Sequence, residues 1–540
     1  MRYFLFLLTL QFFHSISFAQ WSEGGMPESF SQLSSAVTFT NLPPFDFTTM
    51  HAADSVNDQS KGAYRFGYNH MVDIDILKSS TPLTSNNGTR IWRTGITSSG
   101  ASTINLTFDE YELPEGAKLF IYTPDKKFLL GAFTSKNNNA SHQFATDLIP
   151  DDSIILEYDA PATTINEGHL HLYRVTHGYR GINDFVSTRS FGDAGSCQIN
   201  VNCPLGDLWQ HEKRGIICLV VGGNEFCSAV LVNDVPQDGT PYVLTANHCN
   251  DGDEASWVFR FNWETPACEE PATNPFSQSL SGGELKARSD TSDFCLVQIT
   301  GGLSGGTIPA SYAPFFNGWS NADVPADSII AIHHPGGDVK KISGASNPVT
   351  SQYYNGVQCW KIGEWTEGCT EGGSSGSPIF DQHHHIVGQL YDGPSACNQP
   401  SNLMTDYYGK FSVSWLGNGT DETQLKRWLD PDNTGTTMID GYDGALNSAV
   451  SSIHTLPGII VFPNPNDGNF EVTTNSETAA IQLLDIQGRN IAGMSAGSFL
   501  QGKSAFQFRN VTDGMYIIRL VEKTSVVTQK VVVDTDLHIQ

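Results

Sequence analysis

All ten cysteines of this 540-residue chain lie between Cys197 and Cys397. An even number of cysteines confined to one segment predicts a domain held by disulfides, provided that the chain reaches an oxidising compartment. A chain of this length is also too long for a single hydrophobic core. The cysteines therefore divide the chain into a cysteine-rich block and two flanking blocks that have none.

The first residues predict export. Arg2 supplies a positive charge, residues 3–13 form an apolar run, and small residues near Ala19 offer a cleavage position. This run is too short to cross a bilayer core of about 30 Å, and no later stretch is long enough. We expect a signal peptide over residues 1–19 and no transmembrane helix; a buried N-terminal helix is the alternative.

The chain is strongly acidic, with a net charge of −27 and 30 basic residues. Such a surface repels phosphate backbones, which argues against nucleic acid as a partner and suits cationic substrates. The sequence has neither paired CxxC motifs nor a phosphate-binding loop, so we expect no metal and no cofactor. The histidine run 383–385 follows an apolar strand and is interpreted as a hairpin loop.

Short β-branched and aromatic runs separated by Gly, Pro and Asn predict a mostly β protein. Residues 117–122, 153–158 and 480–485 are examples of expected strands. Helical patterns are scarce, and the best one covers residues 422–429, with Pro431 as its end.

Five segments follow from these patterns. After the signal peptide we expect a β-rich block over 20–190, the cysteine-rich block over 191–444, a linker over 445–455 and a compact β-sandwich over 456–540.

Three segments of the cysteine-rich block carry residue types that act together in nucleophilic catalysis. His248 ends an apolar strand, Asp293 precedes another, and Ser375 lies in the glycine-rich run 372–378. A serine hydroxyl needs a base whose pKa lies near neutrality, and a carboxylate fixes the tautomer of that base. Glycines leave backbone N–H groups free for an oxyanion, and we assign these donors to Gly373 and Ser375.

The cysteine-rich block resembles the trypsin-type (chymotrypsin-fold) serine peptidases and, among them, the bacterial lysyl endopeptidases. The resemblance covers residues 196–443 and implies two six-stranded antiparallel barrels with the catalytic triad between them. His248 and Asp293 then belong to the first barrel and the nucleophile Ser375 to the second. It rests on the motifs at 196–204, 245–249, 291–294, 331–335, 373–378 and 428–431.

Substrate preference is inferred separately. The position six residues before Ser375, often a carboxylate in trypsin-like enzymes, is Cys369. The resemblance instead implies that Asp406, nine residues beyond Cys397, binds the ammonium of a P1 lysine. Tyr391 stands where those relatives carry a histidine near the cleft, with Tyr353 or Tyr354 as its stacking partner.

The leading hypothesis is a secreted serine endopeptidase that acts after lysine in protein or peptide substrates. The first alternative is a preference for arginine or for both basic residues. The second, of another class, is a surface adhesin with an inactive peptidase domain.

The resemblance also implies three disulfides, and two further pairs follow from proximity and from exclusion. The pairs are Cys197–Cys397, Cys203–Cys268 and Cys227–Cys249, then Cys359–Cys369 and Cys218–Cys295.

The block over 20–190 resembles the pro-region of such peptidases, which makes the chain a zymogen. Ser374 replaces the aspartate that pairs with the freed N-terminus in trypsin, so that activation route is not available. The junction 187–195 contains Arg189 but no lysine. A permanent adhesive or carbohydrate-binding domain is the alternative.

The last block resembles the C-terminal sorting domains of the type IX secretion system, on the residues at 461–465, 484–488, 514–516 and 530–533. This resemblance implies the type IX machinery as a partner, with release from the cell or attachment to its outer surface. An immunoglobulin-like spacer is the alternative.

Overall fold

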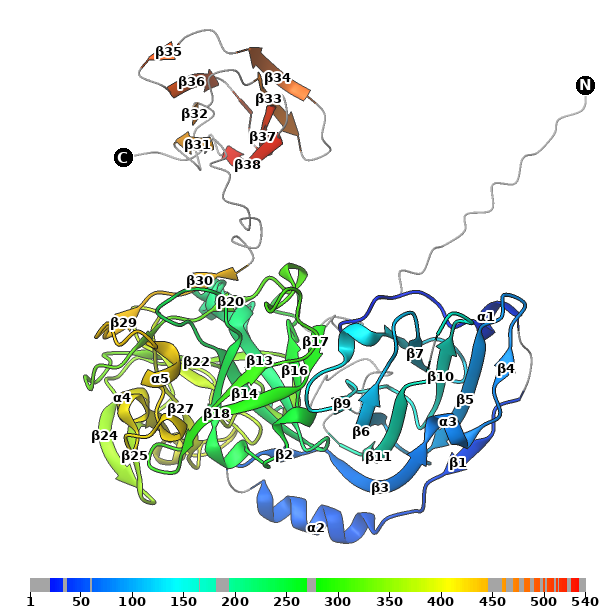
Figure 1. Ribbon diagram of the computed structural model, residues 1–540. Coiled ribbons are helices and arrows are strands. Elements are labelled where there is room, and N and C mark those ends of the chain that lie inside the picture. Colours follow the sequence, from blue (N-terminus) through cyan, green and yellow to red (C-terminus); the bar gives the residue numbers. More distant parts are fainter. Residues whose placement is uncertain are drawn as a thin grey trace, which may run out of the picture. The chain divides into compact units, whose positions relative to one another are not determined.

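The computed structural model describes residues 20–32, 36–58, 61–164, 166–180, 194–269 and 278–444, together with strands and two further residues between 459 and 533. The expected signal peptide, the linker and Arg189 lie outside the described residues. The chain forms two compact units, Met1–Ala449 and Val450–Gln540 (Figure 1). The expectation of a mostly β protein is confirmed.

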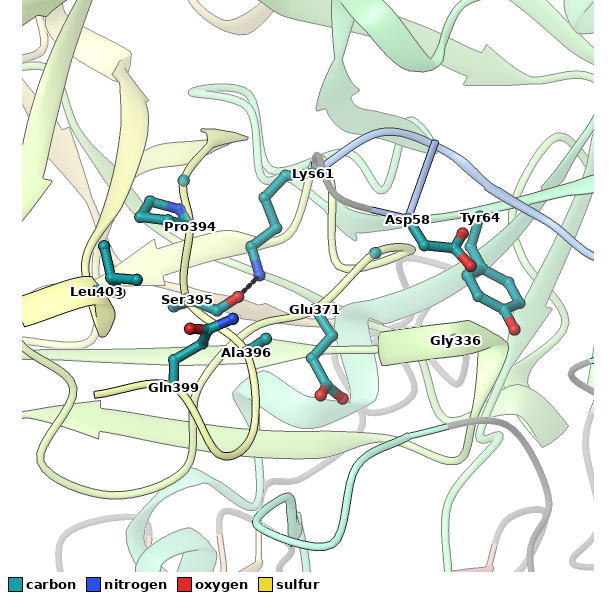
Figure 2. A pocket seen from close by; sticks show the side chains of 12 residues that line it. Asp58, Lys61, Tyr64, Gly336, Glu371, Pro394, Ser395, Ala396, Gln399 and Leu403 are labelled. Atoms are coloured by element: carbon teal, nitrogen blue, oxygen red, sulfur yellow. Dashed lines mark hydrogen bonds between the residues drawn. The ribbon is translucent and has the colours of Figure 1, made fainter. Parts of the chain in front are cut away.

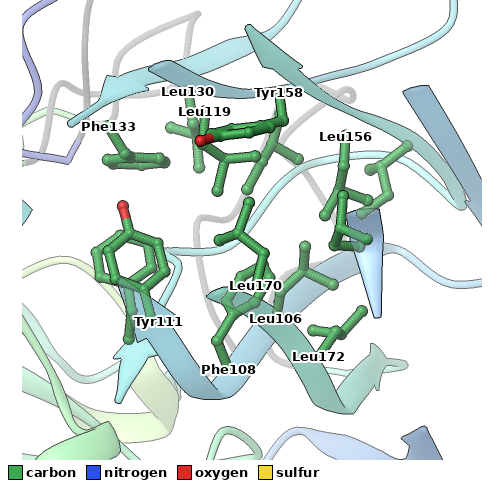
Figure 3. Packing of buried hydrophobic residues seen from close by; sticks show 14 of the residues in the cluster. Leu106, Phe108, Tyr111, Leu119, Leu130, Phe133, Leu156, Tyr158, Leu170 and Leu172 are labelled. Atoms are coloured by element: carbon green, nitrogen blue, oxygen red, sulfur yellow. The ribbon is translucent and has the colours of Figure 1, made fainter. Parts of the chain in front are cut away.

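The N-terminal block consists of two sheets whose apolar side chains pack together. Phe108 and Leu170 from one sheet meet Leu119 and Leu156 from the other in a closed core (Figure 3). One sheet has the order β1-β5-β10-β7-β8, with β4 beside β5, and the other has the order β3-β11-β6-β9. The strands of the first sheet are β1 (Phe39–Asn41), β4 (Leu83–Thr84), β5 (Arg90–Thr97), β7 (Lys118–Tyr122), β8 (Leu129–Phe133) and β10 (Ser153–Ala160). Those of the second are β3 (Gly67–Asp75), β6 (Thr103–Glu112), β9 (Phe144–Ala145) and β11 (His169–Gly178).

Helix α2 (Phe47–Asn57) was not expected from the sequence. Its N-terminus is capped by Asp46, whose carboxylate accepts the amide of Thr49 at 3.1 Å, a common way to satisfy a free helical N–H. The helix lies just before the segment that crosses to the central block. The short helices α1 (Ser29–Gln32) and α3 (Ile76–Ser79) complete this part of the fold.

The first sheet of the central block has the order β17-β16-β13-β14-β15-β19-β18. An eighth strand, β2 (Tyr64–Arg65), comes from the N-terminal block and pairs with β14. The sheet therefore joins the two blocks into one unit. Its own strands are β13 (Ile216–Val221), β14 (Glu225–Leu231), β15 (Tyr242–Ala246), β16 (Val258–Phe261), β17 (Gln278–Ser281), β18 (Gly283–Ser289) and β19 (Phe294–Ile299).

The second sheet of the central block has the path β12-β23-β22-β26-β27-β28-β25-β24, with β21 paired to β27 and β29 paired to β21. The expected hairpin loop at 383–385 joins β26 to β27. The strands are β12 (Ile199–Asn200), β21 (Trp319–Ser320), β22 (Ile329–His333), β23 (Lys341–Ala345), β24 (Thr350–Tyr354), β25 (Val357–Ile362), β26 (Pro378–Phe380), β27 (Ile386–Asp392), β28 (Asp406–Lys410) and β29 (Met438–Ile439). A small ladder of β20 (Phe315–Phe316) and β30 (Tyr442–Asp443) stands apart.

The helix expected over 422–429 is divided. A single 3-10 turn covers Asp421–Thr423, and the one-turn helix α5 covers Lys426–Leu429. Thr420 caps the start of the first turn through a capping box with Thr423, and the extended backbone of Gln424 ends that turn. Helix α4 (Phe411–Leu416) follows β28 directly.

Three of the expected disulfides are present: Cys197–Cys397, Cys203–Cys268 and Cys227–Cys249. The prediction of two further pairs was wrong, because Cys218, Cys295, Cys359 and Cys369 are free, buried thiols. Burial raises the pKa of each of them to about 12, so they stay protonated and inert.

The geometry of the sheets explains both errors. Side chains alternate along β13, so Cys218 faces the cluster that contains Phe66, whereas Cys295 faces the opposite interior with Leu219. Cys359 packs beside Tyr407, in a different cluster from Cys369.

The C-terminal unit consists of two four-stranded sheets with the orders β31-β32-β36-β35 and β34-β33-β37-β38. The strand expected at 480–485 is present as β33. The bounds are β31 (Ile459–Phe462), β32 (Phe470–Thr474), β33 (Ala480–Asp485), β34 (Asn490–Ser495), β35 (Phe499–Leu500), β36 (Lys503–Phe508), β37 (Gly514–Val521) and β38 (Val526–Val533).

Candidate functional site

The structure brings His248 and Asp293 together. β15 ends at Ala246, two residues before His248, and pairs with β19, which begins immediately after Asp293. Nδ1 of His248 lies 2.7 Å from Oδ2 of Asp293, and Oδ1 accepts the backbone N–H of His248 at 3.0 Å. One carboxylate thus fixes both the ring and the backbone of the histidine.

Asp293 and His248 shift each other's pKa. Burial raises the pKa of Asp293, which is 4% exposed, and the neighbouring imidazole opposes that rise. Burial lowers the pKa of His248, but the charge of Asp293 and its hydrogen bond outweigh burial, so the pKa lies above its ordinary value. The imidazole is therefore a stronger base than a free histidine.

Ser375 lies in a turn that the first sheet holds from behind. Its carbonyl accepts the N–H of Ser228 on β14 at 2.8 Å, and the Ser228 hydroxyl donates to the carbonyl of Gly373 at 3.0 Å. Gly376 has a φ of +80°, and a Cβ there would lie 2.5 Å from the carbonyl oxygen of Ser228. Only glycine fits this approach, which keeps the serine loop against the strand.

Asp406 begins β28 and is fully buried. Its Oδ2 accepts three hydrogen bonds, from Trp365 Nε1 at 2.6 Å, Thr370 Oγ1 at 2.7 Å and Ser395 Oγ at 2.5 Å. Among the described residues, Oδ1 has no hydrogen-bond partner. We call this group of four residues the Asp406 pocket.

Gly393 lets the chain pass close to the Asp406 pocket. It has a φ of +154°, and a Cβ there would lie 2.1 Å from Oδ1 of Asp406. A side chain at this position would therefore collide with the carboxylate oxygen that has no partner. The pKa of Asp406 is raised because burial disfavours its charge, and the nearby ammonium of Lys61 opposes that effect.

Tyr391, at the end of β27, lies near the histidine. Its ring centroid is 6.3 Å from that of His248 and 6.3 Å from that of Tyr354, in both cases edge to face. Tyr354 in turn stacks on Tyr407 at 3.8 Å, whereas Tyr353 is 68% exposed. Of the two partners considered for Tyr391, Tyr354 is the one in contact.

His333 and His334 are fully buried. The ring of His333 makes hydrogen bonds to the hydroxyls of Ser374 at 2.8 Å and Ser343 at 3.0 Å. Burial lowers the pKa of His333 to about 3 and that of His334 well below its ordinary value, so both are neutral. His333 supports the residue next to Ser375.

Sequence reasoning missed one residue of the site. Lys61, from the N-terminal block, places its ammonium in the Asp406 pocket, where it donates to the carbonyls of Thr370 and Ser395. Figure 2 shows the bond to Ser395. Its backbone carbonyl accepts the hydroxyl of Ser375 at 2.5 Å. Beside it lies a cavity of about 460 Å³. No local pattern marks Lys61, because the contact to Ser375 spans 314 residues.

Two families match parts of the chain. Residues 191–409 match the family described as "Lysyl endopeptidase, C-terminal domain", which includes His248, Asp293, Ser375 and Asp406. Residues 460–534 match the "Secretion system C-terminal sorting domain". Among the described residues, no helix is both long and apolar enough to cross a membrane.

A curated relative, the lysyl endopeptidase of Pseudomonas aeruginosa, is 24% identical over 389 residues, which cover 66% of this chain and 80% of the relative. Solved structures with weak similarity include a thermostable serine protease, AL20, from an extremophilic microorganism, with 15% identity, coverage of 37% of this chain and 92% of that chain, and a TM-score of 0.27. The HtrA-type protease AlgW with a tripeptide has 11% identity, coverage of 60% and 94%, and the same TM-score. Scores of this size do not define a common fold.

The sorting domain indicates export. The lysyl endopeptidase match covers residues 191–409, and the curated relative is also a lysyl endopeptidase. These residues match the C-terminal domain of lysyl endopeptidases, and the chain is an exported serine endopeptidase.

Proposed function

We propose that the chain hydrolyses peptide bonds on the carboxyl side of lysine through an acyl-enzyme on Ser375. The observation that carries this proposal is the buried Asp406 carboxylate, which has one oxygen without a partner and lies in a pocket that already holds an ammonium group. A buried carboxylate is costly unless a cation pairs with it, so the pocket favours a positively charged P1 side chain.

Each residue of the triad has a defined step. His248 takes the proton of Ser375 as the hydroxyl attacks the carbonyl carbon, and returns it to the leaving amine. Asp293 holds the imidazole in the tautomer with its proton on Nδ1 and stabilises the imidazolium. The N–H groups of Gly373 and Ser375 stabilise the oxyanion, each contributing about 3–4 kcal/mol to the barrier reduction. Water then attacks the ester of the acyl-enzyme, again with His248 as base and then acid, and the Ser375 hydroxyl is released.

The Asp406 pocket favours lysine over arginine. Two backbone carbonyls accept the compact ammonium of Lys61, and the charge of Asp406 acts on it from nearby, whereas a planar guanidinium requires acceptors in a forked arrangement. Tyr391 and Tyr354 form an aromatic wall beside His248, where they contact the substrate next to the scissile bond.

We further propose that residues 20–190 are a pro-region and that the C-terminal unit engages the type IX secretion machinery. The match of residues 460–534 to the sorting domain supports the proposed role of the C-terminal unit in secretion.

The test is a digest of a denatured protein mixture by the active enzyme, with cleavage sites read by mass spectrometry and Ser375→Ala as the control. Cuts after lysine that are absent from the control are expected. Cuts after arginine at a similar rate would replace the lysine assignment by the mixed-specificity alternative. Equal cutting by Ser375→Ala would reject the nucleophile.

A further inference from the structure

The ammonium of Lys61 lies in the Asp406 pocket, where a P1 lysine is expected to bind, and it donates to the carbonyls of two residues of that pocket. Its side chain is extended through a protein interior in which the residue is only 5% exposed. Burial lowers the pKa of its ammonium, and the charge of Asp406 opposes that change. A buried ammonium requires several acceptors, and the carbonyls of Thr370 and Ser395 provide them.

The backbone around Lys61 runs through the catalytic centre. The Lys61 carbonyl accepts the Ser375 hydroxyl and also contacts the imidazole of His248 as an acceptor. The next carbonyl, that of Gly62, accepts the N–H of Gly373 at 3.2 Å. The peptide bond between Lys61 and Gly62 therefore lies at the nucleophile.

This arrangement differs from a reactive one in two respects. The proton of Ser375 points to the Lys61 carbonyl, although catalysis requires it to point to the base. The N–H of Gly373, a proposed oxyanion donor, is used by the carbonyl of Gly62, which is not the carbonyl under attack. The segment occupies the site without being set up for cleavage.

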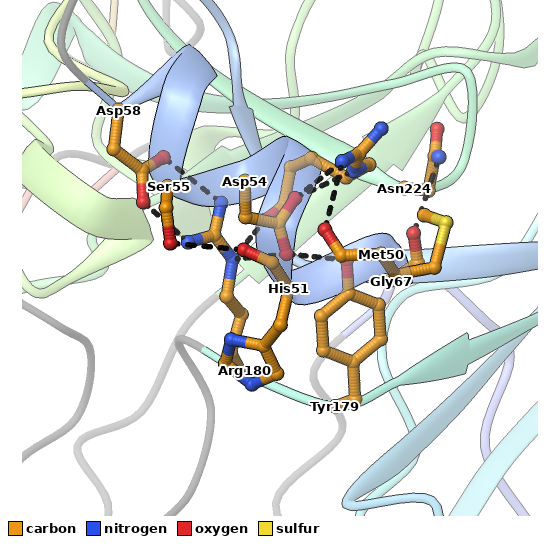
Figure 4. A network of polar contacts seen from close by, with 10 residues as sticks. Met50, His51, Asp54, Ser55, Asp58, Gly67, Tyr179, Arg180 and Asn224 are labelled. Carbon is orange, nitrogen blue, oxygen red and sulfur yellow. Dashed lines mark hydrogen bonds and ion pairs between the residues drawn. The ribbon is translucent and has the colours of Figure 1, made fainter. Parts of the chain in front are cut away.

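The chain is anchored just before Lys61. On helix α2, Asp54 accepts hydrogen bonds from Arg65 Nε and from the Tyr179 hydroxyl, each at 2.8 Å (Figure 4). Asp58 receives two N–H groups of Arg180, at 2.6 and 3.0 Å. These contacts fix the end of the helix to the body of the N-terminal block.

The chain is also anchored just after Lys61. Tyr64 and Arg65 form β2, which pairs with Phe226 and Glu225 at the start of β14. Phe66 stacks on Phe226 with ring centroids 4.2 Å apart. Residues on both sides of the Lys61–Gly62 bond are therefore held in place independently of that bond.

Anchors on both sides oppose net cleavage. If Ser375 attacks Lys61, the bond to Gly62 breaks and the new Gly62 amine stays beside the ester. Its attack on the ester reforms the peptide bond and returns the hydroxyl to Ser375, in competition with water. A held amine has a very high effective concentration, so resynthesis is favoured.

We propose that the N-terminal block is a lysine-presenting inhibitor of the peptidase in its own chain, with Lys61 as the residue that fills the specificity pocket. This inference rests on the proposed lysine preference of the Asp406 pocket. It assigns to Lys61 the inhibition that a pro-region exerts on its peptidase.

The experiment uses the full-length precursor, with two readouts. A small fluorophosphonate labels Ser375 whatever the P1 preference, and a lysyl anilide reports lysine-directed hydrolysis. Wild type is expected to react slowly in both while intact mass shows the Lys61–Gly62 bond unbroken. Lys61→Ala and Lys61→Met are expected to react at least tenfold faster. Lys118→Ala removes an exposed lysine of the same block and is expected to match wild type.

Melting temperatures establish that each variant is folded. Folded Lys61 variants that are labelled as slowly as wild type would overturn the proposal. So would a wild-type precursor whose activity rises in step with cleavage after Lys61, because Lys61 would then be a processing site. Fast labelling of Lys61→Ala without lysyl hydrolysis would reject the lysine preference and leave the inhibitory role standing.

Discussion

Asp293 holds His248 at two points: its Oδ2 lies 2.7 Å from Nδ1 of the ring, and its Oδ1 accepts the backbone N–H of the same residue at 3.0 Å. Asp293 reaches this position with a φ of +55°, an unusual conformation for a residue other than glycine. The ring orientation and the course of the β15 end therefore depend on a single carboxylate.

Asp293→Asn is expected to lower kcat by about 10⁴-fold, because an amide permits the unproductive imidazole tautomer. Burial alone lowers the pKa of His248, so loss of the carboxylate moves the acid limb of kcat/KM to lower pH. The measurement is a pH–rate profile on a lysyl substrate. Asp290→Asn, which alters an exposed neighbour that accepts from Asn247, is the matched control. An unshifted acid limb would contradict the assigned partnership.

Asp406→Asn is expected to reduce the preference for lysine over an uncharged isostere such as norleucine. Removing one partner of a buried ion pair costs about 3–5 kcal/mol, which corresponds to at least a 100-fold loss in kcat/KM for lysine. Norleucine substrates serve as the internal control, since they do not use the charge. An unchanged ratio in the variant would exclude Asp406 as the determinant.

Loss of the Cys227–Cys249 disulfide is expected to affect both stability and activity. It closes a loop of 22 residues, so the double serine variant loses about 3 kcal/mol of unfolding free energy, and Cys249 is the neighbour of His248. The Cys203–Cys268 double variant, with a loop of 65 residues, is the control and loses about 4 kcal/mol. Only the Cys227–Cys249 variant is expected to lower kcat. Denaturant unfolding measures the loss of stability, and steady-state kinetics measures kcat. An equal loss of kcat in both variants would contradict a special role of the Cys227–Cys249 disulfide.

His333 is expected to make the central block sensitive to acid. Its pKa is lowered by burial to about 3, below the ordinary value of 6.5 that it regains on unfolding. The unfolded state therefore binds a proton that the folded state does not, and stability falls as the pH drops below about 6.5. Between about pH 6.5 and pH 5 this costs about 2 kcal/mol.

His333→Gln, which does not titrate, is expected to lose about 2 kcal/mol less than wild type over the same range in urea unfolding. The comparison isolates His333 from the carboxylates, which titrate in both proteins. Parallel stability curves for the two proteins would show that the histidine is already protonated in the folded state.

Much of the site is local in sequence and could therefore be predicted. His248 and Asp293 flank strands with recognisable apolar patterns, and Ser375 lies in a glycine-rich loop. Each of the three can therefore be recognised from its neighbours in the sequence. Asp406 was inferred from its spacing to Cys397. The residues that contact this site were harder to predict from the sequence. The choice of Tyr354 over Tyr353, for example, depends on which face of β24 points inward.

Features that depend on distant contacts were missed or wrong. Cys359 and Cys369 are close in sequence but pack in separate clusters, so proximity misled the assignment. Helix α2 is held by ion pairs to Arg65 and Arg180, which a periodicity argument does not detect. Lys61 contacts Ser375 only because two blocks pack together.

The pairing of β2 with the start of β14 has a consequence for an enzyme from which the proposed pro-region is removed. Without the N-terminal block, the backbone of Glu225 and the ring of Phe226 would lose their cover, which would leave an open strand edge next to an aromatic surface. Such edges recruit further strands from other molecules. The acidic composition of the chain repels other copies, and salt screens that repulsion. An enzyme without the proposed pro-region is thus expected to self-associate most readily in high-salt media.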